Sequence, residues 1–417
     1  MNVDLLIHSA LQLLTIQGGP QRGKALGALH ILNGGAVACR SGKIVAVGES
    51  NALRAGVNAE HEIDASGMVV MPGFVDPHTH AVWVGDRANE FELRVAGASY
   101  MDIMAAGGGI AASVNAARHA SLEELLTETR PRLKGMLAHG TTTIEVKTGY
   151  GLDRQTELRM LDAILKLDEE GPWDLVPTFL GAHAIPPGED AASYTARLCV
   201  DILPAVKAHW EEVGCGRPLP FVDVFCETGA FDLALSRHIL ETARGLGFPL
   251  KIHADEFDGL GGTGLAVELG AASADHLVCT PAGDIAALGE SETVAVSLPC
   301  TPFGLGQSDY TPAQDILNAG GILALAYDIN PGTAWCESMQ FVIALACRYL
   351  HLTPAQAIAA ATINAAAALQ REESIGSLEN GKQADLLILN IPDYRHLGYR
   401  FGTNLVAHVV KRGSLLF

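Results

Sequence analysis

The amino-acid sequence predicts an α/β protein in which a (β/α)8 TIM-like barrel carries a small β-sandwich domain formed by both chain termini. Three observations point to this fold. Eight short apolar runs, mostly without alternating polar residues, recur through the middle of the chain, as expected for parallel strands covered on both faces. Segments with helical periodicity separate these runs, an alternation typical of α/β folds. The two ends of the chain carry only short β-type runs.

The terminal segments are expected to form one domain together. Strand-like runs lie at residues 3–6, 36–39, 44–47, 384–389 and 407–410. The pair Ser41-Gly42 between two of them is a good hairpin turn. Because neither end alone is expected to supply enough strands for a stable sheet, the simplest arrangement is a composite β domain of residues 1–70 and 370–417, with residues 71–369 inserted as the barrel.

The barrel elements follow in chain order. Strands are expected at residues 69–75, 141–147, 175–180, 221–226, 250–253, 271–277, 293–298 and 322–326. Between them, residues 122–139 and 157–170 are amphipathic and residues 354–369 form an alanine-rich helical segment. Eight strand–helix units in this length favour a closed barrel. A doubly wound open sheet is the alternative, since strand count alone does not prove closure.

Composition excludes several classes of partner. The 417 residues include 28 basic and 47 acidic side chains, giving a net charge of −19, which disfavours nucleic acid and anionic membranes. The N-terminus lacks the basic start of a signal peptide, and no apolar run is long enough to span a bilayer. Eight cysteines without a C-x-x-C pair are typical of reduced thiols. We therefore expect a cytoplasmic protein.

Chemistry-bearing side chains recur where the predicted strands end. Five of the fifteen histidines end four strands, and an aspartate ends the last one: they are His78, His80, His183, His253, His276 and Asp328. Barrel active sites are built from these carboxyl ends. Residues i and i+2 of a strand point the same way, so His78 and His80 can both face the barrel axis.

Four of these residues predict a metal site. Three imidazoles, from His78, His80 and His253, together with the Asp328 carboxylate suit one divalent transition metal. Each residue alone has an ordinary explanation: a lone histidine at a strand end is usually structural, and Asp328 before Asn-Pro-Gly resembles a helix cap. The joint pattern favours the metal.

A glycine-rich stretch offers a competing interpretation. Residues 259–264 match G-x-G-x-x-G after a strand, which is the pattern of dinucleotide-binding folds. The match is weak, because the chain contains 45 glycines and the preceding strand already ends in His253 and Glu256. These glycines are expected to form a mobile or tightly turned loop beside the pocket, and residues 107–109 a similar one or an ordinary turn.

The chain resembles the amidohydrolase superfamily and, within it, the imidazolonepropionases of histidine degradation. The superfamily pattern lies in residues 76–80, His253, His276 and Asp328. The narrower resemblance rests on residues 86–91, 107–110, 145–151, 181–187, 251–256, 273–276 and 328–333, which cover the barrel in order.

The resemblance implies an activity and a set of site residues. It implies hydrolysis of 4-imidazolone-5-propanoate to N-formimidoyl-L-glutamate with zinc or iron, in a homodimer. The implied metal ligands are His78, His80, His253 and Asp328. The implied contacts to substrate or product are Arg87, Tyr150, His183, Glu256, Asn330, Gly332 and Thr333. Asp328 and His276 are expected to accept the proton of the attacking water or to orient that water, with His276 more a neighbour of the metal than a ligand. Glu256 and His183 are expected to bind the ring nitrogens and to deliver a proton to the leaving nitrogen.

Individual residues leave alternatives open. Arg87 offers a planar fork for the substrate's propionate, but it could equally pair with Glu90 at the surface. Tyr150 is either a hydroxyl donor or an ordinary packed side chain. Tyr327 and Ile329 depart from the family pattern at positions that could reshape the pocket floor. The strand at 221–226 contains no lysine, so a carbamylated lysine bridging two metals is not expected.

Two rival functions are considered. A deaminase of a nitrogen heterocycle would share the H-x-H pair and the Glu256 position, but a neutral base gives no role to Arg87. A non-enzymatic relative that lost its metal is disfavoured by the four retained ligands.

Overall fold

A parallel eight-stranded sheet forms the centre of the molecule in the computed structural model, which describes residues 1–98 and 108–417. Its strands, in spatial and chain order, are β8 (Phe74–Asp76), β9 (Thr141–Lys147), β10 (Asp174–Ala182), β11 (Phe221–Cys226), β12 (Lys251–Ala254), β13 (Ser273–His276), β14 (Val294–Ser297) and β15 (Ile322–Leu325). Gly107, expected in a glycine turn, lies outside the described residues.

Backbone hydrogen bonds beyond the last strand close the barrel. The Asp328 amide donates to the His78 carbonyl at 3.1 Å, and the His80 amide donates to the Ile329 carbonyl at 2.9 Å. The first and last strands therefore meet at their carboxyl ends, through the residues proposed to hold a metal. The expected (β/α)8 barrel is confirmed, and the open-sheet alternative is wrong.

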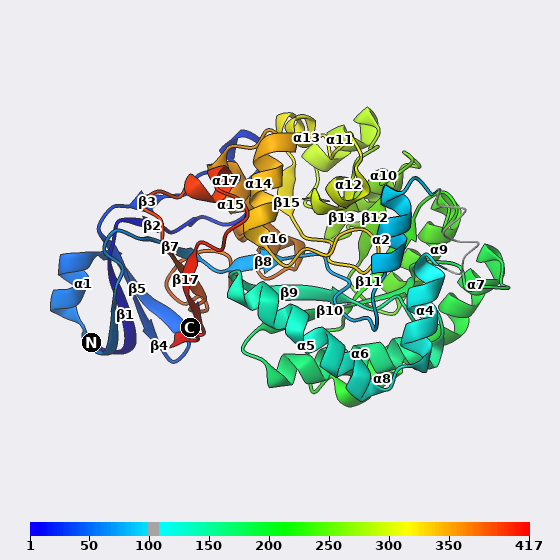
Figure 1. Ribbon diagram of the computed structural model, residues 1–417, viewed down its shortest axis with the longest axis horizontal. Coiled ribbons are helices and arrows are strands. Elements are labelled where there is room, and N and C mark those ends of the chain that lie inside the picture. Colours follow the sequence, from blue (N-terminus) through cyan, green and yellow to red (C-terminus); the bar gives the residue numbers. More distant parts are fainter. Residues whose placement is uncertain (99–107) are drawn as a thin grey trace.

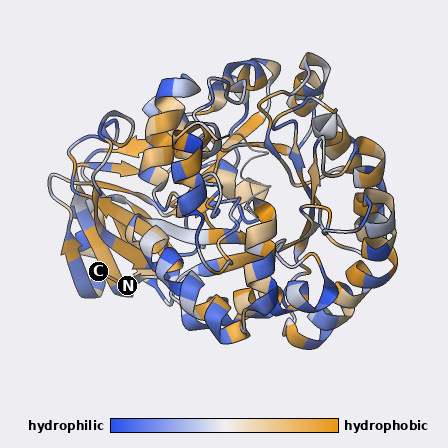
Figure 2. Cartoon of the chain, turned by 45° about the vertical axis from the view of Figure 1, so that its right-hand side comes forward, coloured by the Kyte–Doolittle hydropathy of each residue, from blue (hydrophilic) through white to orange (hydrophobic). Residues whose placement is uncertain are grey.

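Helices surround the barrel. They are α2 (Ala88–Val95), α4 (Ile110–His119), α5 (Leu122–Ala138), α6 (Arg154–Glu170), α7 (Ala191–Arg197), α8 (Leu203–Val213), α9 (Leu233–Gly245), α10 (Gly262–Leu269), α11 (Ala282–Gly289), α12 (Cys300–Leu305), α13 (Ala313–Ala319), α14 (Met339–Tyr349), α15 (Pro354–Ala360) and α16 (Ile363–Ala368). A π-helical turn, Leu198–Ile202, joins α7 to α8. Figure 2 shows apolar strands inside and helices with mixed outer faces, the pattern that places the core between sheet and helices.

The alanine-rich segment 354–369 is two helices rather than the single one expected. The helical backbone breaks at Thr362, whose φ and ψ are −130° and −92°. The break exposes the Ala361 carbonyl, which accepts a hydrogen bond from the Val75 amide of β8 at 3.1 Å. A barrel strand thus takes a carbonyl that a continuous helix would have used.

The predicted strand 69–75 is also two strands. Residues before Gly73 form β7 (Val69–Pro72), and residues after it form β8. Strand β7 pairs outside the barrel with β16 (Leu386–Leu389) and with β2 (Gln12–Leu14). Gly73 has no room for a side chain, since a Cβ there would lie 2.3 Å from the Thr142 hydroxyl. This close approach lets the chain pass from one sheet to the other.

Two further sheets lie beside the barrel (Figure 1), with both termini on that side. One has the order β5-β4-β1-β6 and the other the order β18-β17-β16-β7-β2-β3. Their bounds are β1 (Asn2–Ala10), β2 (Gln12–Leu14), β3 (Ile31–Leu32), β4 (Gly35–Arg40), β5 (Lys43–Glu49), β6 (Asn58–Asp64), β16 (Leu386–Leu389), β17 (Val406–Lys411) and β18 (Ser414–Leu415). Helix α1 (Ser50–Gly56) packs on the first sheet, whereas α17 (His396–Tyr399) packs against α14 and α15, and a 3-10 turn at Gly23–Ala25 packs against α13.

The two sheets share one apolar core. Leu5 and Val37 of the first sheet cluster with Val70, Leu386 and Ile388 of the second. The second sheet combines both ends of the chain, whereas the first comes entirely from the N-terminal segment. The expectation that neither end alone supplies a sheet was therefore wrong for the N-terminal end.

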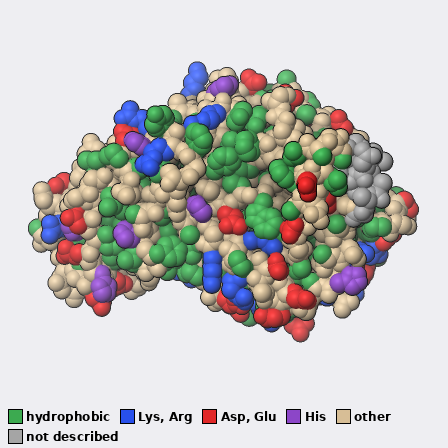
Figure 3. Space-filling view, viewed as in Figure 1, with side chains coloured by type: hydrophobic (Ala, Val, Ile, Leu, Met, Phe, Trp, Pro, Cys, Tyr) green, Lys and Arg blue, Asp and Glu red, His purple; other side chains and the backbone are tan. Residues whose placement is uncertain are grey.

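The surface carries charges of both signs, and the cysteines are unpaired. Acidic and basic side chains are interspersed over the face seen in Figure 3. All eight cysteines are free thiols. Within residues 1–98 and 108–417, no helix is long and apolar enough to cross a membrane.

Candidate active site

The four predicted metal ligands come together at the carboxyl ends of the barrel strands. His78 and His80 follow β8, His253 lies in β12 and Asp328 follows β15. The Nε2 atoms of His80 and His253 are 3.3 Å apart. The Asp328 Oδ1 lies 3.5 Å from the His78 Nε2 and 3.4 Å from the His80 Nε2. All four side chains are buried.

The donor set fits a transition-metal ion. The buried Nε2 of His78 has no hydrogen-bond partner among the described residues. Its Nδ1 lies 2.6 Å from Asp275, a carboxylate that only accepts, so the proton sits on Nδ1 and the Nε2 lone pair faces the cluster. Burial lowers the pKa of His78 and His80, which keeps both imidazoles neutral, as metal ligation requires. Three nitrogens and one oxygen converging in this way suit zinc or iron.

The Asp328 carboxylate is held by helix α12. The Thr301 hydroxyl donates to Oδ2, which leaves Oδ1 directed at the histidines. Burial raises the pKa of Asp328 to about 6, so this carboxylate is a stronger base than an exposed aspartate. The alternative role as a helix cap is not what this side chain does.

His276 and Glu256 lie at the edge of the cluster. The His276 ring centroid is 5.3 Å from that of His253 and 5.4 Å from that of His78. Its Nδ1 is 3.6 Å from the Glu256 carboxylate. Burial lowers the pKa of His276 and, with the neighbouring Asp328 charge, raises the pKa of Glu256. His276 also forms a second possible ligand set with His78 and His253.

A cavity of about 160 Å³ opens directly onto the cluster. Its walls include every residue predicted to contact substrate: Arg87, Tyr150, His183, Glu256, Asn330, Gly332 and Thr333. Ile110, Phe225 and Phe257, which were not predicted, add apolar surface. A neighbouring cavity of about 540 Å³ shares Arg87, Gly332 and Thr333 with it.

His183 has a defined tautomer. Its Nδ1 donates to the Gly149 carbonyl at 3.0 Å, so the Nε2 carries a lone pair. Its ring stacks on His80 with centroids 4.8 Å apart. Burial, followed by the nearby His253, lowers the pKa of His183 to about 3. His183 is therefore neutral at physiological pH and can accept a hydrogen bond through Nε2.

Arg87 pairs with Glu90, one of the two alternatives that the sequence left open, and it also lines the catalytic cavity. Its Nε and Nη2 donate to Glu90 at 2.8 and 2.6 Å, yet the guanidinium also lines the catalytic cavity. Nη1 faces Gly332, where an added Cβ would lie only 2.4 Å away. Glycine at this position is what lets the guanidinium reach the cavity.

Asn330 holds the turn that follows Asp328. Its Oδ1 accepts from the amides of Gly332 and Thr333 at 2.9 and 2.8 Å, and its Nδ2 donates to the Asp328 carbonyl at 2.8 Å. The turn thus presents Gly332 and Thr333 to the cavity.

Tyr327 and Ile329 do not line the catalytic cavity. The Tyr327 hydroxyl bonds to Thr141, at the start of β9, and Ile329 is fully buried beside Thr79. The two departures from the family pattern therefore face away from the pocket.

Sequence reasoning missed the carboxylates behind the ligands. Asp275 contacts His78, and Asp223 lies 2.9 Å from the Nδ1 of His253. A charged residue inside an otherwise apolar parallel strand was the available signal, because such a residue is buried at a cost. Lys147, in the predicted strand 141–147, carried the same signal, whereas Thr301 carried none.

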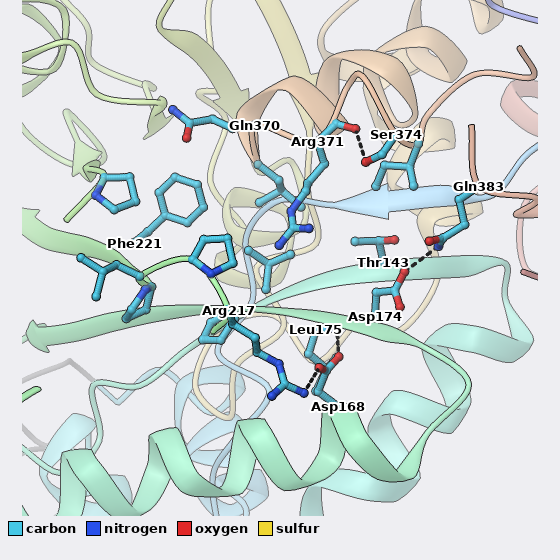
Figure 4. A pocket seen from close by; sticks show the side chains of 18 of the residues that line it. Thr143, Asp168, Asp174, Leu175, Arg217, Phe221, Gln370, Arg371, Ser374 and Gln383 are labelled. Carbon is cyan, nitrogen blue, oxygen red and sulfur yellow. Dashed lines mark hydrogen bonds and ion pairs between the residues drawn. The ribbon is translucent and has the colours of Figure 1, made fainter. Parts of the chain in front are cut away.

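Another cavity, of about 350 Å³, lies at the opposite, amino-terminal ends of β10 and β11. Its polar side chains pair with one another, Arg217 with Asp168 and Gln383 with Asp174 (Figure 4). It contains none of the predicted site residues.

Comparison with known proteins agrees with this geometry. Two models described as "Amidohydrolase family" match residues 233–416 and 61–119. An imidazolonepropionase from Herpetosiphon aurantiacus is 54% identical, covering 100% of this chain and 97% of its own length. One from Chloroflexus aggregans is 50% identical, covering 99% and 98%.

Solved structures share the fold at low identity. A zinc-containing adenosine deaminase from Xanthomonas campestris is 20% identical, with a TM-score of 0.72 over 99% of this chain and 93% of its own. E. coli guanine deaminase is 14% identical, with a TM-score of 0.71 over 99% and 98%.

Proposed function

Because the chain belongs to the imidazolonepropionase family of amidohydrolases, we propose that it opens the ring of 4-imidazolone-5-propanoate with water, giving N-formimidoyl-L-glutamate. Full-length identity of 54% to a curated imidazolonepropionase is the observation that carries this assignment. The pocket supports it, since three of the four proposed ligands, His80, His253 and Asp328, line one cavity together with Arg87.

His78, His80, His253 and Asp328 would hold one zinc or iron ion. When bound, such an ion lowers the pKa of water toward neutrality and so supplies a nucleophile at physiological pH. Asp328, whose pKa is raised to about 6, is placed to accept the proton of the attacking water, and His276 to orient that water. Attack at the ring carbonyl carbon is followed by cleavage of its bond to the ring nitrogen.

The leaving nitrogen needs a proton, which Glu256 is suited to supply. Burial and the Asp328 charge raise the pKa of Glu256 well above its ordinary value, which favours the protonated form that a proton donor needs. His183 was expected to share this role. Its pKa of about 3 and its tautomer favour another one, accepting a hydrogen bond from a ring N–H. We therefore assign proton delivery to Glu256 and ring orientation to His183.

Arg87 would bind the propionate of the substrate. Its guanidinium lines the cavity while Glu90 holds it from the side. A charge-assisted pair here gives the pocket a preference for acids over neutral bases. Deaminases resemble this chain only at 14–20% identity, in fold, and a neutral heterocycle would leave Arg87 without a partner.

The decisive experiment follows the products. We expect 4-imidazolone-5-propanoate to lose its ring absorbance and give one product heavier by one water, without ammonia, because the leaving nitrogen stays attached. Cytosine and guanine should be poor substrates. Stoichiometric ammonia from a base, released faster than the ring opens, would contradict the assignment.

Metal content tests the centre separately. Elemental analysis should find about one zinc or iron ion per chain. His80→Ala should lose the ion and turnover while keeping wild-type circular dichroism. Full activity in a metal-free preparation would exclude the proposed centre. A cytoplasmic homodimer is part of the same proposal, and sedimentation analysis of the purified protein tests its dimeric state.

A further inference from the structure

Five charged side chains lie inside the barrel behind the metal ligands. They are Glu145 and Lys147 on β9, Asp223 on β11, Lys251 on β12 and Asp275 on β13, and none is accessible to solvent. Barrel interiors are usually filled with branched apolar side chains. Burying five charges is costly unless they are paired, and the barrel fold itself does not call for them.

Two of the carboxylates contact the proposed ligands directly. Asp275 Oδ2 lies 2.6 Å from the Nδ1 of His78, and Asp223 Oδ2 lies 2.9 Å from the Nδ1 of His253. A carboxylate can only accept, so the hydrogen bond between Asp275 and His78 places the imidazole proton of His78 on Nδ1 and leaves its Nε2 lone pair for a metal. The Asp223 carboxylate lies close to the His253 Nδ1 without completing a hydrogen bond among the described residues, and its negative charge favours the proton on that nitrogen.

Neighbouring groups fix the orientation of both carboxylates. The Ser273 hydroxyl donates to Asp275 Oδ1 at 2.6 Å. The Val224 amide donates to Asp223 Oδ1 at 2.7 Å. Each carboxylate thus has one oxygen engaged by its own or an adjacent strand, and its other oxygen faces a histidine.

Lys147 joins the two carboxylates. Its Nζ lies 2.8 Å from Asp223 and 3.7 Å from Asp275, and it donates to Glu145 at 2.6 Å. Three carboxylates around one Nζ suit an ammonium and would repel a carbamate. Lys251 adds the second cation and donates to the Pro77 carbonyl at 2.7 Å, next to His78 in the chain.

We propose that Asp223, Asp275 and Lys147 form one positioning unit that sets the tautomers of His253 and His78 and thereby tightens metal binding. Lys147 links the two aspartates into one unit, because its positive charge compensates the negative charges of both carboxylates. The proposal rests on the proposed function only in taking His78 and His253 as metal ligands. It concerns affinity and proton position rather than a chemical step.

Isosteric variants test this unit. In Asp275→Asn and Asp223→Asn, the new amide can donate to Nδ1 and so drive the imidazole proton onto Nε2, where it competes with the metal. Zinc affinity, measured by competition with a chromophoric chelator, should fall about 10- to 100-fold in each variant. Metal-free protein labelled with 15N at histidine should show the Nε2-protonated form of the histidine concerned, a signal that a merely structural role would not move.

Asp385→Asn is the matched control. Asp385 is a similarly buried carboxylate, 2.7 Å from the Nζ of Lys411, but it lies in the small domain. Its zinc affinity should stay within about twofold of wild type. Lys147 is tested by the double variant Asp223→Asn/Asp275→Asn, whose loss of affinity should be smaller than the product of the two single losses.

Ser273→Ala is a milder variant for the case that an aspartate variant does not fold. It removes one hydrogen bond from Asp275 and should weaken zinc binding about 2- to 10-fold. Folded aspartate variants with wild-type zinc affinity and Nδ1-protonated histidines would overturn the proposal. If the wild-type protein bound no metal, the proposed centre would fail, and the 15N spectra would still decide the tautomers.

Discussion

At the scale of single residues, burial acts in opposite directions on the two groups that face the reacting ring. It disfavours the charged form of each, so the pKa of His183 falls to about 3 while that of Glu256 rises. The histidine is thus neutral, and the protonated form of the carboxyl is favoured. One physical cause gives the pocket both a hydrogen-bond acceptor and a proton donor.

Glu256→Gln should reveal the stability cost of that donor. A carboxyl with a raised folded-state pKa binds its proton more tightly in the folded than in the unfolded chain, so stability falls as pH rises above about 4.5. Removing it should raise the thermal midpoint of the metal-free protein at pH 8, with the gain vanishing near pH 4.5. Turnover should fall about 100-fold or more, because an amide cannot deliver a proton.

Glu268→Gln is the control for this pH dependence. Glu268 is exposed, and its hydrogen bond to Arg237 lowers its pKa, so its removal should give no gain at pH 8. Equal thermal midpoints for Glu256→Gln and wild type at both pH values would show that ionisation of Glu256 does not destabilise the folded protein.

Arg87→Met tests the carboxylate clamp. A charge-assisted hydrogen bond contributes roughly 1.5–3 kcal/mol, so KM for 4-imidazolone-5-propanoate should rise about 10- to 150-fold. Steady-state kinetics measure this, with Arg130→Met as a control that breaks only an exposed pair with Glu170. A wild-type KM in Arg87→Met would leave Arg87 as a partner of Glu90 alone.

At the scale of elements, the site depends on how the strands end. Asp255, His276 and Asp328 follow or close β12, β13 and β15 with φ angles of 52°, 80° and 59°. Left-handed backbone costs non-glycine residues about 1–3 kcal/mol each. The hydrogen bonds of each turn offset that cost, and the abrupt change of direction keeps these side chains at the mouth of the barrel.

Asp255→Ala should destabilise helix α10 and the turn beside Glu256. The Asp255 carboxylate accepts from the Gly261, Gly262 and Thr263 amides and from the Thr263 hydroxyl, so it caps a helix whose own first residues are glycine and threonine. Leaving these buried donors unpaired should cost about 1–3 kcal/mol of unfolding free energy, measured by urea titration. The glycine-rich match at 259–264 is thus a helix start capped by a carboxylate.

Asp232→Ala provides the comparison, since Asp232 caps helix α9 at an exposed position. It should cost about 1 kcal/mol and leave turnover unchanged. If Asp255→Ala cost no more than Asp232→Ala, the buried cap would not be a special feature of this strand end.

At the scale of the whole molecule, one lysine connects the two domains. Lys411 of β17 lies 2.7 Å from Asp174, at the start of β10, and 2.7 Å from Asp385. Although burial alone would raise the pKa of Asp174, Lys411 and its neighbours lower it. The amino-terminal end of the barrel is therefore tied to the small domain, while the catalytic end remains free for substrate.

Lys411→Met should weaken this connection without touching the pocket. The buried Asp385 would lose its cation, whereas the partly exposed Asp174 would keep Arg412, and the cost should be about 3–5 kcal/mol in unfolding free energy at pH 7. Because an aspartate with a depressed pKa stabilises fully only above its unfolded value, the difference from wild type should shrink as pH falls below about 4. Urea unfolding measures both, and kcat/KM should change less than twofold. An unaltered unfolding midpoint would show that Lys411 adds nothing to the other contacts that hold the domains together.

The sequence by itself determined the barrel and the residues that meet at its mouth. Apolar runs such as Thr141–Lys147 and Phe221–Cys226 are strands within the predicted bounds. Their order places every strand's carboxyl end on one side, so His78, His253 and Asp328 had to converge once the sheet closed. The local sequence pattern was enough to predict this convergence, because in a parallel barrel the residues at the carboxyl ends of all strands lie at the same end of the barrel.

The contacts between residues on different barrel strands could be learned only from the three-dimensional structure. The split between β7 and β8, the contacts of Asp275 and Asp223 with the ligand histidines, and the tautomer of His183 all depend on partners far away in the chain. Hydrogen bonds and pKa shifts are set by which groups surround a side chain after burial. The spacing of residues along the chain carries no information about those distant neighbours. The metal ligands could therefore be predicted from the sequence, but the carboxylates that orient them could not.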